Sequence, residues 1–152
     1  MSEAPFDLPR AQRWFGIEFN NLAWDLLEKP DRAAEETDRM IHAAHASVHH
    51  WLAAGNAVNH LRGMILLANV YAGAQNAENA LRYARRALEL SEDAGQTQSA
   101  FDRATAFACA ARAHLVAGDR DESRRLAHLA RHAAESLEAD DRAVFAQLCP
   151  DL

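Results

Sequence analysis

A pattern of small residues occurs three times along the sequence, and this repetition restricts the fold more than any other feature. In each of three segments, two small side chains lie three positions apart among charged and apolar residues. The pairs are Ala44 with Ser47, Ala84 with Ala87, and Ala127 with Ala130. Residues three or four positions apart share one face of a helix, and small residues there let a neighbouring helix approach closely. The repetition therefore predicts helices that pack in equivalent pairs.

Capping and breaking residues divide the chain into seven expected helices. With only 6 Gly and 4 Pro in 152 residues, breakers are scarce, and no window alternates apolar and polar residues as a β-strand does. Pro9 suits a first helical turn, and Asp31, Asn56, Asn76 and Asp119 suit N-caps. We expect helices over about 9–27, 31–54, 56–73, 76–95, 98–117, 119–137 and 140–149, the last ended by Pro150. The expected fold is a single all-α domain over residues 1–152.

The middle segment resembles a tetratricopeptide repeat, which is a hairpin of two helices. The matching residues are Leu67, Ala68 and Tyr71 in the first helix and Ala80, Ala84 and Ala87 in the second. In the third segment Gly118 falls at the family's turn glycine, whereas the first segment has a longer turn without one. The resemblance implies a right-handed superhelical stack of three hairpins over residues 9–54, 56–95 and 98–137. An amphipathic helix at 140–149 would cap the open end of the stack.

The same resemblance implies a binding surface for a protein partner. In the family, the first helix of each hairpin lines a concave groove that holds a peptide or a helix. Carried over position by position, the groove residues are Ile17, Asn20, Trp24, Arg62, Ile65, Asn69, Arg112 and Leu115. Asparagine amides can hold a peptide backbone, and arginine can bind a carboxylate. The positions with which some family members bind a C-terminal carboxylate are not reproduced, so we expect a different ligand.

Aromatic residues gather at the start of the chain and form two apolar stripes on the first expected helix. Phe15 and Phe19 belong to a stripe suited to packing on the next helices. Trp14, Ile17 and Trp24 lie on another face. A helix that is apolar on two faces is either buried on both or presents one to a partner. The second stripe is therefore core, a homodimer contact or an anchor for a peptide.

Four histidines suggest an alternative function, that of a metal-dependent helical-bundle enzyme. They are His42, His45, His49 and His60. Histidines spaced i,i+4 on a helix can chelate Zn²⁺. Arg82, Arg85 and Glu89 occupy the positions of the first three in the next repeat, which favours a solvated helix face. We therefore expect no metal ion and no other cofactor.

Composition excludes several other classes of function. The formal net charge of −6 leaves no basic field for nucleic acid or for an anionic membrane. The common nucleotide-binding, hydrolase and metalloprotease motifs do not occur. Residues 1–10 lack the apolar region of a secretory signal, and Cys109 and Cys149 are expected to be buried thiols, so we expect a cytoplasmic protein. Abundant alanine and arginine indicate a GC-rich, bacterial genome. We expect a non-enzymatic protein-binding module or homo-oligomerising scaffold.

Overall fold

A computed structural model describes residues 6–149, and every regular element in that range is helical. Its α-helices are α1 (Leu8–Glu28), α2 (Ala34–Ala54), α3 (Ala57–Gly73), α4 (Ala77–Ala94), α5 (Ala100–Val116), α6 (Arg120–Ala134) and α7 (Ala139–Leu148). A 3-10 turn, η1 (Gly95–Thr97), joins α4 to the segment before α5. The expectation of an all-α fold with seven helices is confirmed for the described part of the chain.

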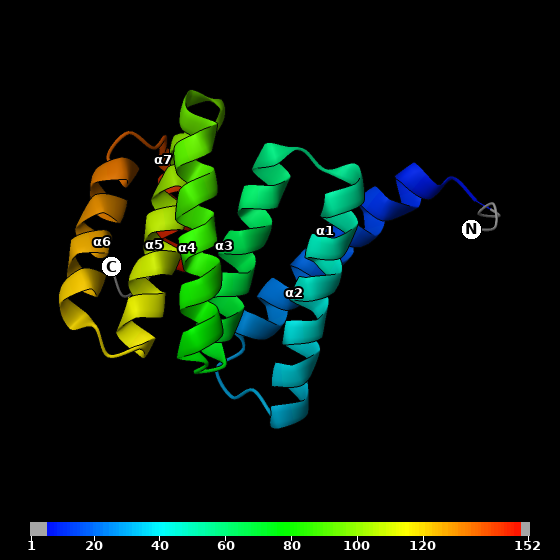
Figure 1. The fold of residues 1–152 in the computed structure, drawn as a ribbon, viewed down its shortest axis with the longest axis horizontal. Helices are drawn as coiled ribbons and strands as arrows, with labels where there is room; N and C mark the ends of the chain where they lie inside the picture. The colour runs from blue at the N-terminus through cyan, green and yellow to red at the C-terminus, as the bar shows by residue number, and fades with distance from the viewer. Residues whose placement is uncertain (1–5, 150–152) are drawn as a thin grey trace.

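Consecutive helices pack against each other in pairs. The most extensive contacts join α1 with α2, α3 with α4, and α5 with α6. Contacts of α2 with α3, of α4 with α5 and of α3 with α5 connect the pairs. Figure 1 shows the pairs in a row, with the beginning of α1 projecting at one end and α6 at the other. The short helix α7 lies next to α5.

Short polar side chains cap the N-termini of several helices at the positions that the sequence predicts. The side-chain oxygen of Asn56 accepts hydrogen bonds from the N–H groups of Val58 and Asn59 at the start of α3. Asn76 and Asp119 cap α4 and α6 in the same way. Pro9 lies in the first turn of α1, as expected. These predictions are confirmed because a cap depends on residues that are adjacent in the sequence.

The predicted start of the second helix is wrong, because Asp31 does not cap it. α2 begins at Ala34, and the N–H of Ala33 donates to Oε2 of Glu36 at 3.0 Å. The guanidinium of Arg32 instead holds the preceding loop in place. It donates to the carbonyl oxygens of Leu26 and Leu27 at 3.0 Å and of Gly73 at 2.9 Å. These bonds tie the loop to the ends of α1 and α3, so the helix starts later.

The C-terminal helices also differ from the expected ranges. α6 ends at Ala134 instead of near residue 137, and α7 begins at Ala139, one residue before Asp140. Pro150, expected to end the last helix, lies outside the described residues. Gly118 has φ +83° between α5 and α6, a left-handed backbone conformation that glycine adopts without strain. This permits the tight turn between the two helices.

The core is centred on α3 and α5. In α3, Leu61, Leu66 and Leu67 are at most 1% exposed. In α5 nearly every buried position is alanine or another small residue, and the alanines that are at most 2% exposed are Ala104, Ala106, Ala108, Ala110, Ala111 and Ala113. Small residues let helix backbones come close together, so neighbouring helices surround α5 tightly. The faces of α3 and α5 that stay open meet in the pocket described below.

A helix must be both long and apolar to span a membrane. Within residues 6–149, no helix combines enough length with enough apolar character to cross a bilayer.

Candidate binding pocket between α1, α3, α5 and α7

A pocket with a volume of about 330 Å³ lies where α1, α3 and α5 meet the end of α7. Its lining combines aromatic and aliphatic side chains with amides, a carboxylate and two guanidinium groups. The lining residues are Asn20, Trp24, Arg62, Ile65, Asn69, Phe101, Asp102, Thr105, Ala108, Arg112, Leu148 and Cys149. An apolar pocket of this size with a few convergent polar groups is typical of a ligand-binding site.

Six of the residues predicted to line a binding groove lie together around this pocket. They are Asn20, Trp24, Arg62, Ile65, Asn69 and Arg112, and they come from α1, α3 and α5. Leu115, which is 51% exposed, lies farther along α5 beside a separate depression against α6. Trp14 and Ile17 lie around another pocket, on the first half of α1. The structure therefore divides the predicted groove residues among three places.

One of the two guanidinium groups in the pocket is neutralised by a buried carboxylate. Arg62 donates from Nε to Oδ1 of Asp102 at 2.6 Å and from Nη2 to Oδ2 at 3.1 Å. The Asp102 side chain is only 3% exposed, whereas that of Arg62 is 56% exposed. Burial raises the pKa of Asp102, but hydrogen bonds from Arg62 and Ser99 outweigh it and hold this pKa below its usual value. The pair joins α3 to α5 and adds no net charge to the pocket.

The second guanidinium group, that of Arg112, contacts only neutral acceptors among the residues that the structure describes. Its Nη1 donates to the Oδ1 atom of Asn69, and its Nη2 donates to the carbonyl oxygen of Leu148 at 2.9 Å. Asn69 in turn donates from Nδ2 to the carbonyl oxygen of Ile65 at 3.0 Å. Within residues 6–149, Arg112 forms no ion pair. The pocket therefore contains one partly buried positive charge that forms no ion pair with a carboxylate of residues 6–149.

Several lining residues were not expected from the sequence. Asp102 lies three positions after Ser99, and the two side chains form a reciprocal cap at the start of α5. That spacing is a signal for the cap, but it does not indicate the bond to Arg62, which lies 40 positions away. Leu148 and Cys149 come from the end of α7, which the resemblance treated only as a capping element. No pattern in the sequence places them beside Arg112.

The two cysteines are buried, as expected. Burial raises the pKa of the Cys109 thiol to about 12. A thiol with so high a pKa is almost wholly protonated near neutral pH, which makes it a poor nucleophile.

The histidine-rich helix α2 is not uniformly solvated, so the expectation of an exposed histidine face is wrong for His45. Its Nε2 atom is hydrogen-bonded to the hydroxyl of Tyr71 at 2.9 Å. Its ring packs edge-on against Tyr71 and Tyr83, with centroid distances of 5.8 and 5.9 Å. Burial, together with the nearby charges of His42 and Arg82, lowers the pKa of His45.

The four histidines considered as metal ligands do not form a metal site in the described part of the chain. His42 and His49 are exposed on α2, and His60 donates from Nε2 to the carbonyl oxygen of Trp51 at 3.0 Å. Among residues 6–149, no group of three or more His, Cys, Asp and Glu side chains could hold a metal ion.

Comparisons with known proteins do not assign the chain to a family. No protein-family model, curated protein sequence or solved structure matches it.

Proposed function

We propose that this chain is a protein-binding module, built as a tetratricopeptide-like stack of helical hairpins, which acts in the cytoplasm by binding and without catalysing a reaction. Its ligand would be an extended peptide or a helix of a partner protein, held in the pocket between α1, α3, α5 and α7. The observation that supports this proposal is the gathering of six residues, chosen by their repeat positions alone, around one pocket.

The composition of the pocket suggests which part of a partner would bind. Trp24, Ile65 and Phe101 provide apolar and aromatic surface for one buried side chain. Large aromatic side chains and arginine contribute most of the free energy at many protein interfaces. Because Arg112 contacts only neutral acceptors within residues 6–149, a carboxylate of the ligand could bind it without displacing another charge of that range. We therefore propose a ligand with an apolar side chain next to an aspartate or a glutamate.

A library of random peptides displayed on phage would test this proposal, followed by titration of the selected peptides. Selected peptides should share an apolar residue beside an acidic one. The variants Trp24→Ala and Arg112→Gln should each raise the dissociation constant by at least about tenfold, the loss expected of anchor residues. Leu115→Ala is the matched control, because Leu115 is exposed on α5 and does not line the pocket.

Two results would contradict the proposal. One is selection of peptides that bind equally well to the wild type and to both pocket variants. The other is a loss of binding in Leu115→Ala as large as in Trp24→Ala, because the binding surface would then extend over α5 and α6. Circular dichroism of each variant shows that its helices remain folded.

A further inference from the structure

We propose that the exposed face of the first half of α1 pairs with the same face of a second copy of this chain, in an antiparallel, two-fold symmetric dimer. This face, called the Trp14 face below, consists of Arg10, Ala11, Trp14, Ile17 and Glu18. The inference goes beyond the proposed function, since it concerns another surface and does not require a ligand in the pocket.

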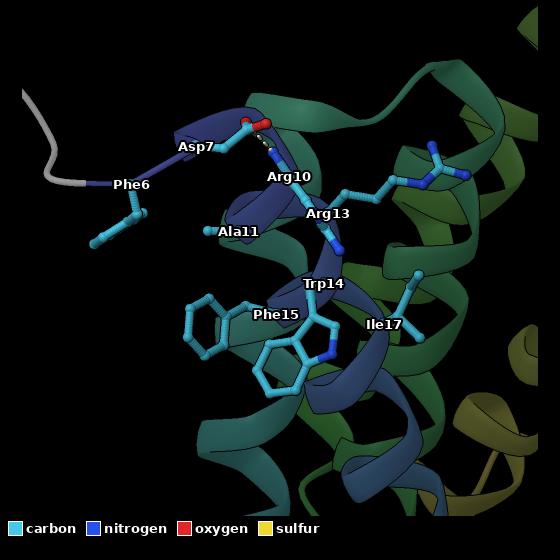
Figure 2. A pocket seen from close by; sticks show the side chains of 8 residues that line it. All are labelled: Phe6, Asp7, Arg10, Ala11, Arg13, Trp14, Phe15 and Ile17. Carbon is cyan, nitrogen blue, oxygen red and sulfur yellow. Dashed lines mark hydrogen bonds between the residues drawn. The ribbon is translucent and has the colours of Figure 1, made fainter.

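Large apolar side chains are exposed on and around the Trp14 face. Trp14 is 55% exposed and Ile17 is 39% exposed. Figure 2 shows Phe15 beside Trp14 and Phe6 farther from it, beyond Phe15; Phe15 is 37% exposed and Phe6 is 59% exposed. Together these residues surround a shallow pocket with a volume of about 680 Å³. An exposed apolar patch rimmed by polar residues marks an interaction surface more often than an ordinary part of the surface.

The opposite face of the same half-helix is already held by α2. The hydroxyl of Ser47 donates to the carbonyl oxygen of Gly16 at 2.7 Å, and His50 donates to the side-chain oxygen of Gln12. A Cβ atom on Gly16 would lie 2.9 Å from the Trp51 ring, so the two helices are in close contact there. The Trp14 face is therefore presented on a fixed helix, which reduces the entropy lost on association.

The charged residues of the Trp14 face can pair with those of a second copy only if the two helices run antiparallel. Arg10 lies four positions before Trp14, and Glu18 lies four positions after it, so all three share one side of the helix. Both charged side chains belong to exposed residues, and neither forms an ion pair within residues 6–149. If two copies cross antiparallel at Trp14, Arg10 of each copy faces Glu18 of the other. Such an isologous contact gives two ion pairs from a single pair of residues.

The apolar residues follow the same symmetry. In the antiparallel pair the two Trp14 side chains meet at the axis, and Ala11 of each copy faces Ile17 of the other, so a small residue is opposite a large one. A parallel pair would instead place Arg10 on Arg10 and Glu18 on Glu18, which is unfavourable. The observed sequence therefore favours the antiparallel arrangement.

The local charge balance favours a second copy over a strongly charged partner. Asp7 and Glu18 offset Arg10 and Arg13 on this part of α1. Nucleic acid and anionic membranes select surfaces with an excess of positive charge. A contact of one short helix face is at the small end of protein interfaces, so we expect a dimer that dissociates at micromolar concentrations.

Sedimentation velocity of the full chain over about a hundredfold range of micromolar concentrations tests the inference. The average mass of the wild type should rise from that of a monomer toward that of a dimer. Trp14→Ala should raise the dissociation constant by more than about thirtyfold, the effect of losing a central aromatic anchor. Arg10→Glu and Glu18→Arg should each raise it by about tenfold, since each replaces two attractions with two repulsions.

The double variant Arg10→Glu/Glu18→Arg is the decisive measurement, because it exchanges the charges and restores the antiparallel pairs. Its dissociation constant should return to within about threefold of the wild type. Leu52→Ala, at an exposed position of α2, and Trp24→Ala, in the pocket, should leave the dimer unchanged. Trp24→Ala also separates this test from that of the proposed function.

Three results would overturn the inference. The first is a wild type that stays a monomer at every concentration. Binding of that monomer to vesicles of anionic lipid would then assign the Trp14 face to a membrane instead of a second copy. The second is a dimer that persists in Trp14→Ala. The third is a double charge-exchange variant that is as weak as the single variants, because the antiparallel register would then be wrong.

Discussion

The first helical pair and the centre of the molecule are built from different kinds of side chain. Only three of the 21 residues of α1 are buried, whereas nine of the 17 residues of α5 are. The exposed residues of α1 include Trp14 and Phe15, whereas most buried residues of α5 are alanines. Large exposed side chains favour contact with another molecule, and small buried ones favour close packing of helices. We infer that the centre provides most of the stability and that the first half of α1 provides a contact surface separate from the pocket.

A leucine-to-alanine substitution made in each region should give the largest difference in the free energy of unfolding. Leu61 on α3 is fully buried, and Leu52 on α2 is 65% exposed. Leu61→Ala should lower the free energy of unfolding by about 2–5 kcal/mol, because it removes buried contacts and leaves a cavity. Leu52→Ala should change it by less than about 0.5 kcal/mol. Urea unfolding followed by circular dichroism measures both. Equal losses in the two variants would remove the distinction between centre and edge.

Replacing a buried alanine by leucine should give the next largest difference in the free energy of unfolding between the centre and the first pair. Ala84 on α4 is 2% exposed and belongs to the central core, where the neighbouring helices leave little space. Ala84→Leu should lower the free energy of unfolding by about 1–3 kcal/mol through overpacking. Ala53→Leu, at an exposed position on α2, is the matched control. If the melting temperature of Ala84→Leu equals that of the control, close packing through small residues is not what holds α4 in place.

Acidification should weaken the first pair before it weakens the centre. The pKa of His45 is lowered by burial, so the unfolded chain binds its proton more readily than the folded chain does. Its contribution to stability is therefore complete above the unfolded pKa of about 6.5 and falls as the pH drops below that value. Asp102, whose pKa is also lowered, loses its contribution only below the usual carboxyl pKa of about 3.9.

Unfolding free energies measured between about pH 7.5 and pH 5 test this order, a range that spans the usual histidine pKa. The wild type should lose stability over this range, and His45→Gln should lose less. His49→Gln, at an exposed position of the same helix, is the matched control. A wild type and a His45→Gln variant with the same pH dependence would show that the contact of His45 with Tyr71 does not couple folding to protonation.

The secondary structure could be predicted from the sequence largely because its signals are local. Asn56, Asn76 and Asp119 cap the helices that follow them, and each contacts N–H groups only two or three residues away. The prediction for Asp31 was wrong because a distant contact dominates there. Arg32 binds the carbonyl oxygen of Gly73, which is 41 positions away, and no local pattern reveals such a bond.

The candidate pocket could likewise be predicted only in part, because some of its contacts join residues that are distant in the sequence. Asn20, Ile65 and Arg112 lie around it as their repeat positions suggested. Its ion pair and the contribution of α7 could not be predicted, because both depend on which helix ends meet in space. His45 is a further case, since its exposure depends on Tyr71 and Tyr83, which belong to the next two helices.

The alanines of α5 also affect how the molecule could respond to a ligand. A methyl group has no rotamers, so the packing around α5 cannot adjust through changes of side-chain torsion angles. At the pocket wall formed by α5, side chains such as Phe101 and Arg112 could adjust to a ligand, whereas the helix behind them is held by its alanine contacts. The position of this wall is therefore set by the distances between helix backbones, while its detailed shape depends on the side chains that line it.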